Sequence, residues 1–178
     1  MSAVLAIGIG CRKDCASDAI AALVRRALEL ALAAERMPSP ARGRRCRSPW
    51  RRADEGDAKR NPPSSALTAF GLLLLQEGEG GGAPARLFTS QTKAAEAGPV
   101  AAAALLGIEF VGLPQAELER AAPRCATRSE RVLRATGLPS LAECAALAGA
   151  GRGSRLILER ISEGGASCAV ALLEEHPS

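Results

Sequence analysis

Apolar residues dominate the first ten positions of this chain and then recur with helical spacing. Residues 3–10 are almost all aliphatic or glycine, which is typical of a buried β-strand. From Ile20 onward, apolar residues return every three to four positions, and charged residues fall between them. The pattern predicts an amphipathic helix over about 18–35, with Ser17 as its N-cap. Its apolar face is expected to comprise Ile20, Leu23, Val24, Ala27, Leu28, Ala31 and Leu32.

The periodicity stops after this helix. Residues 37–65 are rich in proline, serine and arginine, and residues 77–85 are rich in glycine. Neither stretch has enough regularly spaced apolar residues to offset the entropy lost on ordering. We therefore expect a single domain over 1–178 that is interrupted by a disordered insertion at about 37–86.

Strands and helices alternate again after the insertion. Apolar runs predict strands over 86–90 and 108–111, and an alanine-rich helix over 92–106 lies between them. The remaining elements are expected to be helices over 114–120, 129–135 and 140–148 and two strands, 155–161 and 166–173, that form a hairpin. This order predicts an α/β fold, a layered α/β/α domain with a mixed sheet of about five strands.

The positive charge of the chain belongs to one segment. The whole chain has 23 Lys and Arg against 19 Asp and Glu. Residues 36–60 contain nine of these basic residues and three of the acidic ones, so the remainder is slightly acidic. An arginine-rich segment can bind nucleic acid or an acidic protein. The chain has only four aromatic residues and no tyrosine, which argues against base stacking and favours a solvated linker.

Composition also limits the chemistry and the compartment. The six cysteines contain no CxxC pair, and the single histidine is His176, near the end of the chain, so we expect no metal and no cofactor. The cysteines are expected to be reduced thiols. The N-terminal apolar run is too short for a secretory signal, and no apolar run reaches the roughly 20 residues that span a bilayer. We expect a cytoplasmic protein without a membrane partner.

The first strand leads into a basic turn that could bind an anion. Gly8, Gly10, Cys11 and Arg12, followed by Lys13, stand where a strand gives way to a helix. Backbone N–H groups at a helix start favour carboxylate or phosphate groups. The spacing fits neither GxGxxG nor the P-loop, so the alternative is a tight turn with solvated charges. Cys11 could also act as a nucleophile, although no histidine lies near it in sequence.

A second strand-to-helix turn repeats this arrangement. Thr89 and Ser90 end the strand, and Lys93 and Glu96 fall in the first turns of the following helix. If the strands over 4–9 and 87–90 are parallel neighbours, both turns lie at the carboxyl edge of the sheet, where such folds bind ligands. The alternative is ordinary helix capping by Ser90 or Thr92.

A polar loop could complete the rim of such a cleft. Thr127, Ser129 and Glu130 precede a short helix, and could face a ligand or merely cap that helix. Ser140 and Glu143 have the spacing of a capping box and are given no further role.

The order of these motifs resembles the CobE family of cobalamin biosynthesis proteins, which is also the C-terminal domain of CbiG. The resemblance covers about 3–36 and 87–174. It rests on Ala6 to Arg12, Thr89 to Gly98, Thr127 to Val132, Gly137 to Leu147, and Arg155 to Ile161 with Ala166 to Ala171. The family normally has a short connection where this chain has residues 37–86, so that segment is either an insertion or a reading-frame disturbance.

The resemblance implies a role in building the corrin ring of vitamin B12. We expect a binder that holds or hands over a polycarboxylate precorrin or corrinoid intermediate, with other pathway enzymes as further partners. One alternative is a pathway enzyme, hydrolase-like and related to cobalt-precorrin-5A hydrolase, with Cys11, Ser129 or Glu130 as the reactive group. Another is an interaction module that uses the basic insertion. No catalytic residue is assigned.

Overall fold

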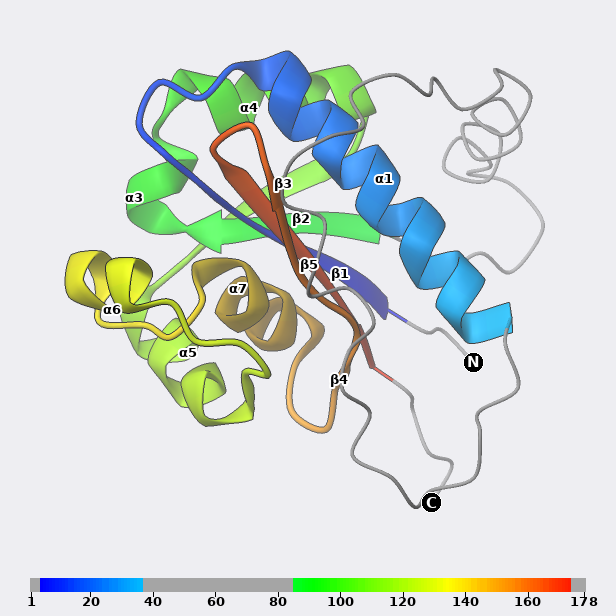
Figure 1. Cartoon of the computed structure of the whole chain (residues 1–178), viewed down its shortest axis with the longest axis vertical. Coiled ribbons are helices and arrows are strands. Elements are labelled where there is room, and N and C mark those ends of the chain that lie inside the picture. The colour runs from blue at the N-terminus through cyan, green and yellow to red at the C-terminus, as the bar shows by residue number, and fades with distance from the viewer. Residues whose placement is uncertain (1–3, 37–84, 174–178) are drawn as a thin grey trace. The chain divides into compact units, whose positions relative to one another are not determined.

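The structure is a computed structural model that describes residues 4–36 and 85–173 (Figure 1). The described residues belong to one compact unit, Met1–Arg36 with Gly81–Ser178. The insertion expected at about 37–86 lies almost entirely outside them, as does His176.

Five strands form one mixed sheet, as the sequence predicts. The order across the sheet is β3-β2-β1-β5-β4. The first three strands of the chain are parallel, with Ile7 opposite Leu87, whereas β5 runs antiparallel to both β1 and β4. The strands are β1 (Val4–Cys11), β2 (Ala85–Ser90), β3 (Glu109–Leu113), β4 (Arg155–Glu163) and β5 (Ala166–Leu173).

The turn of the predicted hairpin consists of two glycines. Gly164 and Gly165 have φ values of 59° and 85°, so both occupy the left-handed region. Two consecutive residues with positive φ match the twist of antiparallel strands, and glycine adopts them without strain. This turn places the start of β5 beside the end of β1, where Cys11 pairs with Ala166.

Helices cover both faces of the sheet (Figure 1). On one face, α1 (Ser17–Arg36) packs on α4 (Ala97–Leu106) and on the hairpin strands, and on the other, α7 (Leu141–Ala150) packs on β1, with α5 (Gln115–Ala121) beside it. The core formed by the described residues is aliphatic apart from Phe88. The predicted apolar face of α1 is confirmed at Ile20, Leu23, Val24, Ala27, Leu28 and Ala31, which are all buried, whereas the side chain of Leu32 is outside the described part of the chain.

Two predictions near helix starts were wrong in detail. The helix expected over 92–106 is two helices, α3 (Gln91–Ala94) and α4, because Glu96 has extended backbone angles. Pro99 explains the break, since a proline inside a continuous helix clashes with the carbonyl four residues earlier. Ser17 is the first residue of α1, and the Ile20 N–H donates to the Ala16 carbonyl, so Ser17 is not its N-cap.

The helices expected over 114–120, 129–135 and 140–148 are confirmed within one or two residues at each end, whereas the 3₁₀ helix between the first two was not predicted. Gly107 ends α4 in the left-handed conformation that suits a helix C-terminus. The segment between β3 and α7 contains α5, the 3₁₀ helix η1 (Ala122–Arg124) and α6 (Glu130–Thr136).

Candidate binding site at the carboxyl edge of the sheet

The loop after β1 is attached to the turn between β4 and β5. The Arg12 N–H donates to the Gly165 carbonyl at 2.9 Å, and the Cys15 thiol lies 3.6 Å from the Gly164 carbonyl oxygen. Asp14 has a φ of 59°, a conformation that Asp tolerates better than most residues. These contacts hold the loop, and the side chains of Arg12 and Lys13 are exposed at the sheet edge.

Gly8 and Gly10 lie within β1 and allow α7 to approach it. A Cβ atom on Gly8 would be 1.9 Å from the Ala142 carbonyl oxygen, a position that real Cβ atoms do not occupy. On Gly10 it would be 3.0 Å from Ser167 Oγ, which is a tighter contact than usual. The glycine requirement therefore comes from the packing of a helix on a strand and not from a tight turn. A ligand contact at either glycine stays a prediction.

The hydroxyl groups that end β2 bind to the protein itself. Thr89 is buried, and its Oγ1 donates to the Ile9 carbonyl at 3.0 Å across the two strands. Ser90 caps α3, because its Oγ accepts from the Lys93 N–H at 3.4 Å. Its Oγ also lies 3.0 Å from Thr92 Oγ1. The capping alternative is thus confirmed for Ser90.

The structure brings the turn after β1 and the turn after β2 together, as the parallel pairing predicts. Lys93 Nζ lies 2.8 Å from Glu96 Oε1, and both side chains are mostly covered. Burial raises the pKa of the Cys11 thiol to about 11. Among the neighbouring charges, Lys93 lowers this pKa, whereas Glu96 and Cys15 raise it. At neutral pH Cys11 is therefore a protonated thiol beside an ion pair.

One atom of this cluster lacks a partner. Glu96 Oε2 is buried and accepts no hydrogen bond from the described residues. Glu96 is also the N-cap residue of α4, but its side chain makes no capping hydrogen bond. An acceptor left without a donor is costly in a protein interior, and such atoms concentrate where a ligand or water binds.

The residues of the third predicted group, the polar loop before α6, bind to other residues of the protein. Thr127 gives two hydrogen bonds to Glu143, from its N–H and from Oγ1, both at 2.9 Å. Ser129 Oγ caps α6 by accepting from the Val132 N–H, and exposed Glu130 pairs with Arg128. No hydrogen bond or ion pair between described residues joins this loop to Cys11 or Lys93.

Sequence reasoning missed the role of Glu143. Ser140 caps α7 as predicted, because its Oγ accepts from the Glu143 N–H. The Glu143 carboxylate does not complete a capping box, but binds Thr127 and the Arg160 N–H. The signal was available, since Glu143 is the one charged residue in the otherwise apolar α7 sequence LAECAALAGA.

A cavity of about 420 Å³ lies away from this edge, between α5 and the end of α7. None of the predicted site residues lines it. Among the described residues, no group of three or more His, Cys, Asp or Glu side chains could hold a metal ion. No helix within 4–36 or 85–173 is long and apolar enough to cross a membrane.

Comparison with known proteins decides the family. Residues 59–171 match the family described as Cobalamin synthesis G C-terminus, CbiG_C. The chain belongs to this family. The match begins at residue 59 and so leaves out β1 and α1, which carry the first motif of the resemblance.

Two crystal structures are similar over nearly their whole length. CobE, a protein from the cobalamin (vitamin B12) biosynthetic pathway, is 27% identical with a TM-score of 0.63; the match covers 98% of this chain and 93% of CobE. Cobalamin biosynthesis protein chiG from Agrobacterium tumefaciens is 32% identical with a TM-score of 0.51, and the match covers 94% of this chain and 97% of that protein. The search of curated proteins finds no significant match. This chain is thus a member of a cobalamin biosynthesis protein family.

Proposed function

We propose that this protein binds a polycarboxylate precorrin or corrinoid intermediate at the carboxyl edge of its sheet and hands it to another enzyme of the pathway. The observation that carries the proposal is the convergence of the two turns: Cys11 lies close enough to Lys93 and Glu96 for both charges to shift its pKa. Membership of a cobalamin biosynthesis family supports the class of ligand.

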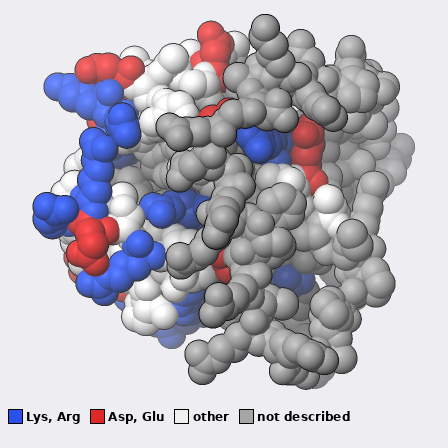
Figure 2. Space-filling view, in the orientation of Figure 1, with Lys and Arg blue, Asp and Glu red and all other residues white. Residues whose placement is uncertain are grey.

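The charges at this edge suit a ligand with several carboxylates. Arg12 and Lys13 are exposed, and neither forms an ion pair with a described residue. Figure 2 shows Lys and Arg side chains spread along the side of the molecule where Figure 1 places the loop after β1, α3 and α6. Guanidinium and ammonium groups form charge-assisted hydrogen bonds with carboxylates, which are stronger than hydrogen bonds between neutral groups.

The chemistry of the cluster favours binding over catalysis. The raised pKa of Cys11 keeps it a thiol at neutral pH, whereas a nucleophilic cysteine needs a lowered pKa. Ser129 is used as a helix cap, and Glu130 is an exposed residue paired with Arg128. We therefore propose no reaction for these residues.

The test is a titration of the purified full chain with hydrogenobyrinic acid and, separately, with an early precorrin. The visible absorbance of the ligand reports binding, measured at two salt concentrations. We expect saturation, with affinity that falls as salt rises because the contacts are between charges. A folded protein that shows no saturable change with either ligand would overturn the proposal.

A further inference from the structure

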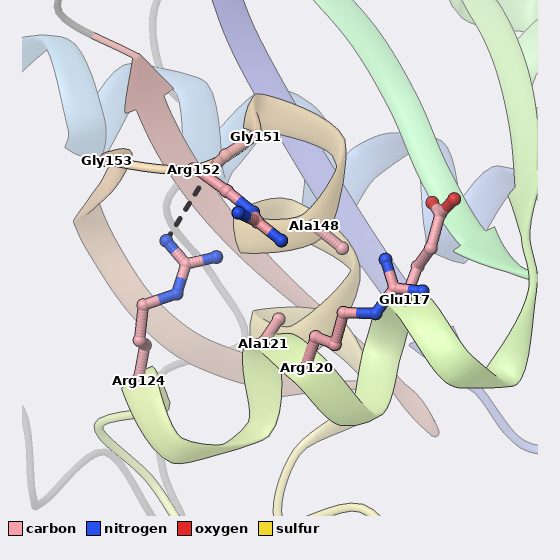
Figure 3. Close-up of a pocket in the computed structure, with 8 residues that line it drawn as sticks. All are labelled: Glu117, Arg120, Ala121, Arg124, Ala148, Gly151, Arg152 and Gly153. Carbon is pink, nitrogen blue, oxygen red and sulfur yellow. Dashed lines mark hydrogen bonds between the residues drawn. The ribbon is translucent and has the colours of Figure 1, made fainter.

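The cavity between α5 and the end of α7 is lined by arginines (Figure 3). Arg120 and Arg124 come from α5 and η1, and Arg152 follows α7. Glu117 is the single carboxylate in the lining. The volume of about 420 Å³ falls within the range of small-molecule sites, about 300–1,000 Å³. The other lining residues are Ala121, Ala148, Gly151 and Gly153, whose small size leaves the space open.

Arg124 neutralises the negative end of α7. Its guanidinium donates to the carbonyls of Leu147, Gly151 and Ser154 and to Ser154 Oγ, at 3.2–3.4 Å. The last carbonyls of a helix carry partial negative charge and would repel an anion. With these carbonyls bound to Arg124, that repulsion is reduced on this side of the cavity.

Arg120 and Arg152 remain available. Both are exposed, and neither forms a hydrogen bond or ion pair with a described residue. Figure 3 shows the side chains of Arg152 and Arg120 on either side of Ala148, with the Arg120 side chain running along α5 toward Glu117. By contrast, Arg26, Arg86 and Arg128 each pair with a glutamate elsewhere on the protein.

We propose that this cavity is a second anion site, which binds a small molecule carrying phosphate or carboxylate groups between Arg120 and Arg152. A guanidinium presents parallel N–H donors that match two oxygens of either group, which a lysine ammonium cannot do. The site lies at the opposite end of α7 from Leu141, which packs near Gly10 at the carboxyl edge. It is therefore separate from the edge that contains Arg12.

The experiment is calorimetric titration of the full chain in chloride buffer with inorganic pyrophosphate and, separately, with citrate. We expect saturable binding of at least one anion, weakened about tenfold or more by Arg120→Ala and by Arg152→Ala. Arg120→Lys should keep the charge but recover only part of the affinity. Arg25→Ala, which removes an exposed arginine of α1, is the matched control and should bind like the unaltered protein.

The two ligands separate the two chemistries. Binding of pyrophosphate alone assigns the site to phosphate-bearing molecules, and binding of citrate alone assigns it to carboxylates. Arg12→Ala should leave this binding unchanged, so failure here is distinct from failure at the carboxyl edge. Saturable binding of neither anion, or equal affinity in both arginine-to-alanine variants and the unaltered protein, would overturn the proposal.

An independent observation concerns two cysteines. Cys125, at the end of η1, and Cys144, in α7, have their sulfur atoms 3.3 Å apart. Cys144 is buried and Cys125 is half-buried, so a small reagent can reach the pair through Cys125. The hydrogen bond between the two thiols lowers the pKa of Cys144 and raises that of Cys125.

We infer that Cys125 and Cys144 form a reversible disulfide when they react with a small-molecule disulfide. Cys125 reacts first because Cys144 is buried. It attacks one sulfur of the reagent as the thiolate, a step that its raised pKa makes slow at neutral pH, and the first small thiol leaves with the Cys125 proton. The Cys144 sulfur then attacks Cys125 Sγ in the mixed disulfide and releases the second. Two protein thiols are oxidised, one small disulfide is reduced to two thiols, and the two protein protons pass to those thiols.

The bond would join the segment before α6, which contains Thr127, to α7. Incubation with glutathione disulfide should remove two hydrogen atoms from the mass of the folded chain, and peptide mapping should recover Cys125 linked to Cys144. The midpoint of thermal unfolding should rise by roughly 5–10 °C, because the cross-link restricts the unfolded chain. Dithiothreitol should reverse both changes.

The control is Cys15→Ser, which should still form the cross-link, whereas Cys125→Ser should not. Circular dichroism checks that each variant folds. A stable glutathione adduct on Cys125, or oxidised protein without the Cys125–Cys144 peptide, would overturn the inference.

Discussion

Glu143 and Glu96 are two carboxylates with opposite surroundings. Glu143 is fully buried, and both its oxygens accept hydrogen bonds, from Thr127 and from the Arg160 N–H. The Glu96 side chain is 29% exposed; its Oε1 pairs with Lys93, while Oε2 is buried without a partner among the described residues.

The difference separates a structural role from the binding role that we propose. A buried charge is stable only when its hydrogen bonds are complete, and Glu143 meets this condition within the protein. It thereby joins α7, the loop before α6 and β4. Glu96 and Lys93 lie instead at an accessible edge, where Glu96 Oε2 is left to accept a hydrogen bond from a donor such as water or an N–H group of a ligand.

The largest effect is expected from Glu143→Ala. It leaves three donors unpaired, the Thr127 N–H and hydroxyl and the Arg160 N–H, and should lower the free energy of unfolding by about 4 kcal/mol. Glu143→Gln keeps one acceptor oxygen, so it should lower the free energy of unfolding by less than Glu143→Ala does. Urea denaturation measures both. If Glu143→Ala is as stable as the unaltered protein, the carboxylate does not hold these elements together.

Gly8→Ala should lower the free energy of unfolding by about 3 kcal/mol, because the added Cβ would displace α7 from β1. This change tests whether close approach of α7 is what brings Glu143 to its partners. Gly10→Ala meets only side-chain atoms at 3.0–3.5 Å and should cost less. Equal stability of the two variants in urea would show that this packing argument fails.

We expect the protein to lose stability at high pH because the thiol of Cys168 is fully buried. Burial raises its pKa from 9.0 to about 12, so between these values the unfolded chain releases a proton that the folded chain keeps. The free energy of unfolding should fall by up to about 1.4 kcal/mol per pH unit across this window. Cys168→Ala should flatten the slope above pH 9, measured by urea denaturation at several pH values. If the free energy of unfolding of Cys168→Ala falls with pH as steeply as that of the unaltered protein, Cys168 is not the group responsible.

The smallest effects on stability are expected at the carboxyl edge. Lys93→Ala and Glu96→Gln should each change the free energy of unfolding by less than about 1 kcal/mol, because the pair is partly exposed. Their effect should appear in the pKa of Cys11, raised further by Lys93→Ala and lowered by Glu96→Gln. The rate of Cys11 alkylation against pH, followed by peptide mass spectrometry, measures this. If the pKa of Cys11 shifts in the same direction in both variants, Lys93 and Glu96 do not act on Cys11 as opposite charges.

Local patterns predicted the fold because its elements follow simple periodicities. The alternation of strands and helices, the apolar face of α1 and the two-glycine hairpin could all be read from neighbouring residues. The break before α4 was missed because alanine composition outweighed the signal of Pro99.

The candidate site could be predicted only as far as strand pairing determines it. Parallel β1 and β2 bring Cys11 and Lys93 to one edge, which the sequence suggested. The lone charge in the apolar α7 sequence marks Glu143 as unusual, but its partners Arg160, 17 residues away, and Thr127 are set by the fold and not by a local pattern. The arginine cavity likewise forms from α5, η1 and the turn after α7, which only the fold brings together.

The most direct test of the central claim is the affinity of the Arg12→Ala and Lys93→Ala variants for hydrogenobyrinic acid, with Arg25→Ala as the control. Lost charge-assisted contacts should weaken binding about tenfold or more in the first two variants, without unfolding them, and leave the control unchanged. Equal affinity in all three variants and the unaltered protein would contradict a carboxylate site at this edge of the sheet.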